Sequence, residues 1–130
     1  MTFAFKMKTT DLGICEWEAL AFFGADPVSQ AYGAEWFDSD SVYEVFRADL
    51  KLSCAIYPIH RDVRLVLSCG RNVIFEWNAQ GLEDICYIEE KSRTILKLIS
   101  SDRDYTMLQV EPEIAISRHS QVSDPDEVAD

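Results

Sequence analysis

The sequence contains few of the residues that most catalytic sites need, and it lacks the long apolar run that a membrane span needs. It has five glycines and two histidines among 130 residues. No apolar run approaches the roughly 20 residues of a membrane span, so we expect no membrane segment. The glycines form neither a G-x-G-x-x-G pattern nor a P-loop, which leaves nucleotide-phosphate binding without a motif. Residues 1–8 do not follow the pattern of a secretory signal, so we expect a cytoplasmic protein.

The four cysteines never occur as a C-x-x-C pair, which is the spacing of zinc knuckles and thioredoxin-like sites. They are Cys15, Cys54, Cys69 and Cys86. Three disulfide pairings are possible by arithmetic. In a reducing cytosol, however, we expect four free thiols that pack as small apolar side chains, and we expect no metal and no other cofactor.

Candidate catalytic groups do not form a recognisable motif. A thiol nucleophile would have to combine Cys54 or Cys69 with His60, and both cysteines share the strand phase of apolar neighbours, which favours burial over reactivity. The acid pairs Glu83-Asp84 and Glu89-Glu90 are adjacent in sequence, so on a strand the two carboxylates of a pair point to opposite faces. The sequence therefore favours a protein that is not an enzyme.

From Val42 onward, short runs rich in β-branched and aromatic residues alternate with turn-like segments. Their spacing of about 8 to 12 residues is typical of an antiparallel meander. No helical pattern between them is long enough for a parallel crossover. Eight strands are predicted here, at residues 42–48, 51–57, 63–68, 73–77, 85–89, 94–99, 105–110 and 114–118.

The part before Val42 predicts one strand and two short helices. Alternating apolar residues indicate a strand at Phe3–Met7. A first helix is expected to begin near Asp11 or Gly13 and to end at Gly24, because helices often end on a left-handed glycine. A second helix is predicted over residues 26–33, with Asp-Pro at its start and a glycine at its end.

These elements predict an α+β fold. We expect a mostly antiparallel β meander of about eight to nine strands, curled into a sheet or partial barrel, with one or two short N-terminal helices packed on it. Residues 1–119 are expected to form a single domain. Residues 120–130 are too polar and acidic to order themselves, so we expect a disordered acidic tail.

The net charge of −11 is unevenly distributed along the chain. Residues 9–46 contain eight acids and no base, residues 47–110 contain nine of each, and residues 111–130 contain six acids and one base. An excess of this size repels phosphate, so nucleic acid and anionic membrane surfaces are excluded as partners of the chain as a whole. The acidic excess belongs to the N-terminal half and the tail.

The base-free segment is also rich in aromatic residues, a combination that suits the binding of a basic protein partner. Aromatic side chains supply anchors and acids supply steering. The alternative is that the aromatics fill the core and the acids only keep the surface soluble. The candidate contact residues are Glu16, Trp17, Glu18, Glu35, Trp36 and Asp38.

In small size, acidity and lack of catalytic motifs, the chain resembles bacterial immunity proteins, which neutralise a toxin nuclease by covering its positive cleft. This resemblance rests on composition and assigns no residue. It implies a non-enzymatic protein-binding module. A second hypothesis is an intracellular carrier of a small molecule or lipid, because a strand, a helix pair and a long meander are similar in order to the lipid-binding barrels. The sequence leaves the oligomeric state open.

Overall fold

A computed structural model of the chain describes residues 12–120, which form nine strands, one α-helix of eight residues and two short 3-10 helices. The predicted strand at Phe3–Met7 and residues 121–130 of the predicted tail lie outside the described residues. Ser120, which we assigned to the tail, is the last residue of a strand. None of the helices in the described part has the length and apolar character needed to cross a membrane. In chain order the elements are α2 (Glu16–Phe23), β1 (Ser29–Tyr32), η1 (Trp36–Asp38), β2 (Ser39–Arg47), β3 (Leu50–Tyr57), η2 (Pro58–His60), β4 (Asp62–Cys69), β5 (Asn72–Ala79), β6 (Asp84–Glu89), β7 (Thr94–Ile99), β8 (Asp104–Gln109) and β9 (Ala115–Ser120).

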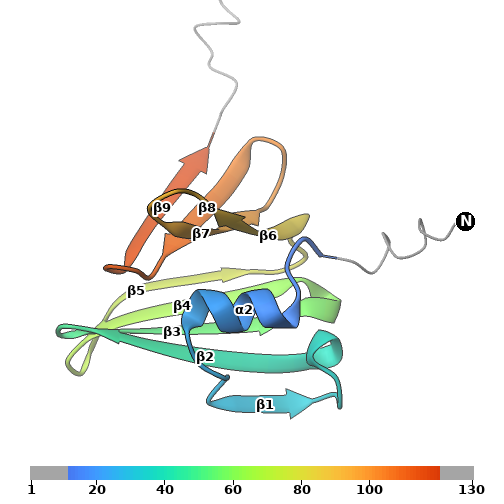
Figure 1. The fold of residues 1–130 in the computed structure, drawn as a ribbon, viewed down its shortest axis with the longest axis horizontal. Coiled ribbons are helices and arrows are strands. Elements are labelled where there is room, and N and C mark those ends of the chain that lie inside the picture. Colours follow the sequence, from blue (N-terminus) through green and yellow to red (C-terminus); the bar gives the residue numbers. More distant parts are fainter. Residues whose placement is uncertain (1–11, 121–130) are drawn as a thin grey trace, which may run out of the picture.

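The strands form two antiparallel sheets, where we expected one curled sheet (Figure 1). β1 to β5 pair in chain order as a five-stranded sheet, and β6 to β9 pair in the same way as a four-stranded sheet. The chain leaves the first sheet after β5, where Gly81 has a φ of 65° and Leu82 donates its backbone N–H to the carbonyl of Arg61 at 2.9 Å. The meander order and the antiparallel pairing are confirmed, and the partial barrel is not.

All eight strands predicted after Val42 are present. Alternation decides which side chains they bury: along β2, Ser41, Tyr43 and Val45 are buried, and the residues between them are partly exposed. Buried residues of β3 and β4 continue the same face, because Tyr43 pairs with Cys54 and Cys54 pairs with Leu65. This inner face of the five-stranded sheet forms one wall of the core.

The predicted second helix, over residues 26–33, is wrong. Residues 29–32 form strand β1, which pairs with β2 so that Ser29 lies opposite Val42 and Tyr32 opposite Ser39. The N–H of Val28 also donates to the carbonyl of Val42 at 2.7 Å. Pairing with a neighbouring strand satisfies these backbone groups as well as a helix would, and it overrides the local Asp-Pro signal.

The first helix is confirmed, with a later start than predicted. Glu18 accepts a hydrogen bond from the backbone N–H of Cys15 at 3.1 Å, which places the capping interaction two residues after Gly13. Gly24 ends the helix as predicted, with a φ of 77° and its N–H donating to the carbonyl of Leu20 at 2.8 Å.

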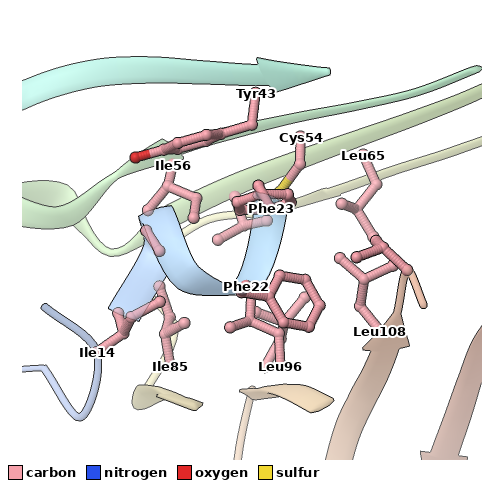
Figure 2. Packing of buried hydrophobic residues seen from close by; sticks show 14 of the residues in the cluster. Ile14, Phe22, Phe23, Tyr43, Cys54, Ile56, Leu65, Ile85, Leu96 and Leu108 are labelled. Carbon is pink, nitrogen blue, oxygen red and sulfur yellow. The ribbon is translucent and has the colours of Figure 1, made fainter. Parts of the chain in front are cut away.

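Helix α2 packs between the two sheets through neighbouring phenylalanines that point in different directions. It contacts β2 of the first sheet and β6 and β7 of the second. Phe23 stacks on Tyr43 with ring centroids 4.4 Å apart, and Phe22 points toward Leu96 of β7 (Figure 2). Both phenylalanines are buried and belong to one hydrophobic cluster that includes residues of both sheets. The helix thereby links the two sheets and fixes the direction of its exposed side.

Candidate functional site

The first turn of α2 carries three of the predicted contact residues. Glu16 is exposed, and the side chain of Trp17 is 64% exposed. Trp17 packs edge-on against Tyr87 of β6, with ring centroids 6.5 Å apart and planes at 70°. Glu18 is half-buried and holds the helix start through its bond to Cys15. This turn therefore presents a fixed indole ring beside two carboxylates.

Helix α2 and strand β6 bring acidic and aromatic side chains together, because Trp17 contacts Tyr87. Leu20, one helical turn after Trp17, is 44% exposed. Partial burial raises the pKa of the Tyr87 hydroxyl, and the charges of Glu89 and Glu18 raise it further. We call the set Glu16, Trp17, Glu18, Leu20, Tyr87 and Glu89 the α2–β6 surface.

Burial and the carboxylates of this region also raise the pKa of a neighbouring thiol, Cys86. Burial raises the pKa of Cys86 to about 11, and the carboxylates of Asp84 and Glu18 add to the shift. Asp84 in turn accepts a hydrogen bond from the N–H of Gly13 at 2.7 Å. The chain that leads into α2 therefore lies against the start of β6.

The other three predicted residues surround η1, where two of them serve the fold. Trp36 is buried, and its Nε1–H donates to the hydroxyl of Tyr43 at 2.8 Å. Asp38 accepts a hydrogen bond from the N–H of Glu35 at 3.1 Å through its side chain, and its carbonyl accepts the N–H of Gly33 at 3.1 Å. Glu35 itself is exposed. Trp36 thus packs in the core and Asp38 ties the loop, while Glu35 faces solvent.

Tyr43 connects the two groups of predicted residues. Burial raises the pKa of Tyr43 to about 12, the hydrogen bond from Trp36 opposes that rise, and the charges of Glu16 and Asp26 contribute to it. The field of Glu16 therefore reaches the hydroxyl that Trp36 binds. The start of α2 and both 3-10 helices lie at the same end of the molecule (Figure 1).

Sequence reasoning missed an aromatic stack at that end. Tyr32 is 80% exposed and stacks on Tyr57, with centroids 5.7 Å apart and planes at 10°. His60 packs edge-on against Tyr57 at 4.5 Å. We call Tyr32, Tyr57 and His60 the tyrosine stack. The stack was missed because a helix was predicted over residues 26–33, although Val28 and Tyr32 are both strand-favouring residues.

A surface groove of about 980 Å³ lies beside the end of α2. Glu89, Glu90, Arg93 and Glu111 line it together with apolar groups of the helix. The space between the sheets is filled by the hydrophobic cluster. A lipid carrier needs an enclosed, mostly apolar cavity, and this groove is neither.

The cysteine and histidine groups considered for catalysis do not meet. Cys54 is buried, and burial raises its pKa to about 12. Cys69 lies at the end of β4 opposite Leu50, whereas His60 lies two residues before the other end of that strand. All four cysteines are free thiols. No cluster of His, Cys, Asp or Glu suitable for a metal occurs in the described part of the chain.

One hydroxyl and imidazole pair is present on β9. Ser117 Oγ lies 3.0 Å from His119 Nε2. The ring of His119 stacks on Tyr105 at 4.7 Å, and both Ser117 and His119 are exposed on the strand. A catalytic serine needs a histidine that is oriented by a third group and a site that excludes water. This pair has an aromatic ring beside the imidazole and is open to solvent.

Comparison with known proteins identifies a shared fold. No protein-family model matches the chain, and no curated protein sequence matches it. Among solved structures, it is similar to a chain of the contact-dependent growth inhibition toxin and immunity protein complex from Klebsiella pneumoniae 342, with a TM-score of 0.73 and 16% sequence identity. The match covers 86% of this chain and 98% of that chain. At this identity the likeness shows that the two chains share a fold across nearly the whole length of the neighbour.

Proposed function

We propose that this chain is an immunity-type protein-binding module that binds a toxin protein and masks its basic surface. The likeness to a chain of a toxin and immunity protein complex carries the proposal, because it extends over 98% of that chain. Fold alone does not assign function, so the choice also rests on the surface chemistry described above.

The α2–β6 surface supports a protein partner. Interfaces concentrate their binding energy in aromatic anchors, and Trp17 and Tyr87 form an edge-on pair with the indole largely exposed. The charges of Glu89 and Glu18 act on Tyr87, and Glu16 directly precedes Trp17 in the chain. A basic partner would be attracted over a distance by these carboxylates and would then bury the indole ring.

A masking role without catalysis agrees with the arrangement of the reactive groups. The most buried thiol, Cys54, is a poor nucleophile at neutral pH because its pKa is about 12. Cys15 and Cys69 are exposed free thiols, which persist in a reducing compartment. We propose that the protein acts in the cytoplasm, where it would meet a toxin that has entered the cell.

A growth assay tests this function. The protein encoded beside the gene for this chain is expressed in bacteria alone and together with the chain. The neighbouring protein alone should arrest growth, and coexpression should restore it. Failure of the chain to restore growth would overturn the proposal, as would a neighbour that is harmless. Growth arrest by the chain on its own would instead assign it the toxin role.

A matched pair of variants tests the surface. Glu16→Lys and Glu76→Lys change the net charge equally, but Glu16 belongs to the α2–β6 surface and Glu76 is an exposed residue of β5. Protection should fall for the first variant and persist for the second. Equal protection by both variants would show that the α2–β6 surface does not bind the toxin. The proposed immunity role would not be affected by that result.

A further inference from the structure

Tyr32 combines strong exposure with an unfavourable backbone conformation. Its φ is 78°, in the left-handed region that bulky residues rarely adopt. Its side chain is 80% exposed, so burial does not compensate for that conformation. Residues held in such conformations persist where the surrounding structure fixes them, and they are concentrated at functional sites.

The loop after Tyr32 is fixed by hydrogen bonds at both ends. Gly33 donates its N–H to the carbonyl of Asp38 at 3.1 Å, and its own carbonyl accepts the hydroxyl of Ser39 at 2.9 Å. The same hydroxyl also donates to the carbonyl of Glu35 at 2.7 Å. A Cβ atom at position 33 would collide with the carbonyl and carboxylate of Asp38. Glycine is therefore required here, and the tight loop sets the orientation of Tyr32.

The tyrosine stack supports one side of the Tyr32 ring. Tyr57 lies almost parallel to that ring, at 10° and 5.7 Å between centroids. His60 in turn packs edge-on against Tyr57 at 4.5 Å. Since Tyr57 covers one ring face and the side chain is 80% exposed, the other face of Tyr32 is open to a partner.

The charges on the segment that carries Tyr32 favour a cation. Every charged side chain on the segment from α2 through η1 is acidic, including Asp26, Glu35 and Asp38. The facing η2 segment contributes His60, which packs on Tyr57, and Arg61, whose guanidinium donates to the carbonyl of Glu83. A cationic side chain over a tyrosine face is stabilised by the ring quadrupole, and guanidinium groups also stack flat on such rings.

We propose that Tyr32 is a preorganised anchor on which a basic protein partner lays an arginine side chain, with Tyr57 behind the ring and Glu35, three residues further along the chain, as the counter-charge. This inference rests on the proposed function in one respect, namely that the partner is the toxin. It adds a second contact point to the α2–β6 surface, at the end of the molecule where α2 begins and η1 and η2 lie (Figure 1). The left-handed backbone of Tyr32 would hold the ring outward before the partner arrives.

One variant separates the ring from the backbone. Tyr32→Asn removes the ring and keeps a residue that tolerates a positive φ. Its affinity for the purified toxin, measured by calorimetry, should fall at least about tenfold, as expected for loss of an aromatic anchor. Its melting temperature should stay equal or rise, because relief of backbone strain offsets the lost stack. A Kd within twofold of the original would overturn the inference, as would a loss of melting temperature that accounts for the weaker binding.

A fluorinated ring at position 32 tests whether the contacting group is a cation. Fluorination withdraws electrons from an aromatic face and weakens its attraction for a cation while the ring remains apolar. The protein with pentafluorophenylalanine at position 32 should therefore bind the toxin at least about fivefold more weakly than the Tyr32→Phe variant does. Equal or tighter binding by the fluorinated protein would exclude an arginine on this ring. If the unmodified chain binds the toxin and these variants bind equally well, only this inference fails; if the unmodified chain does not bind the toxin, the proposed function fails with it.

Discussion

Replacing Tyr43 by phenylalanine should destabilise the fold by about 1–3 kcal/mol without weakening binding to the partner. The hydroxyl of Tyr43 accepts the indole N–H of Trp36 at 2.8 Å, and both side chains are buried. The variant leaves that N–H in the core without its partner. An unsatisfied buried donor costs its full desolvation penalty, which is the source of the expected magnitude.

Urea unfolding followed by tryptophan fluorescence measures this cost. With a typical slope of about 1–3 kcal/mol per molar urea, the midpoint should fall by about 1 M. Tyr87→Phe is the matched control, because its hydroxyl makes only an exposed 3.4 Å hydrogen bond to Glu89, and its stability should stay within about 0.5 kcal/mol. If Tyr43→Phe had the same urea midpoint as Tyr87→Phe, the cost assigned to the unpaired indole N–H of Trp36 would be refuted. A large loss of toxin affinity would show that Trp36 contacts the partner after all.

Two further predictions follow from the titratable groups. The pKa values of Tyr43 and Cys54 are raised from 10.0 and 9.0 to about 12, so the unfolded chain releases these protons at lower pH than the folded chain. Stability should therefore fall as pH rises from about 9 to 12, and Cys54→Ala should show a shallower fall in pH-dependent urea titrations; identical slopes would contradict this. In native protein, a thiol-reactive dye should modify Cys15 and Cys69 readily and Cys54 only after urea unfolding, because the first two are exposed. Equally fast labelling of Cys54 would show that the core opens.

Local patterns predicted the strands because each strand carries its own signal. Alternating β-branched and aromatic residues mark every strand after Val42, and Gly24 marks the end of α2. Strand β1 has only four residues, all exposed, so it lacks an apolar pattern. Its identity depends on pairing with β2, which no local signal reports. The division into two sheets depends likewise on the turn at Gly81, where the chain leaves the first sheet.

The candidate site was predictable only in part, because burial depends on distant partners. Trp17 and Trp36 both follow a glutamate in an acidic aromatic segment, yet one is exposed and the other is buried. The difference arises from Tyr43, seven residues after Trp36, whose hydroxyl provides the acceptor that the buried indole needs. Tyr87 joins Trp17 from a strand about seventy residues away in the chain, a contact that spacing alone does not reveal.

The ionic-strength dependence of toxin association is the sharpest test of binding through the acidic α2–β6 surface. If an acidic surface attracts a basic partner, the association rate constant measured in a stopped-flow instrument should fall at least about tenfold between 20 mM and 500 mM salt. Glu16→Lys should lower the rate at low salt, and Glu76→Lys should lower it less. A rate constant that is independent of salt, and equal in both variants, would contradict binding through the acidic α2–β6 surface.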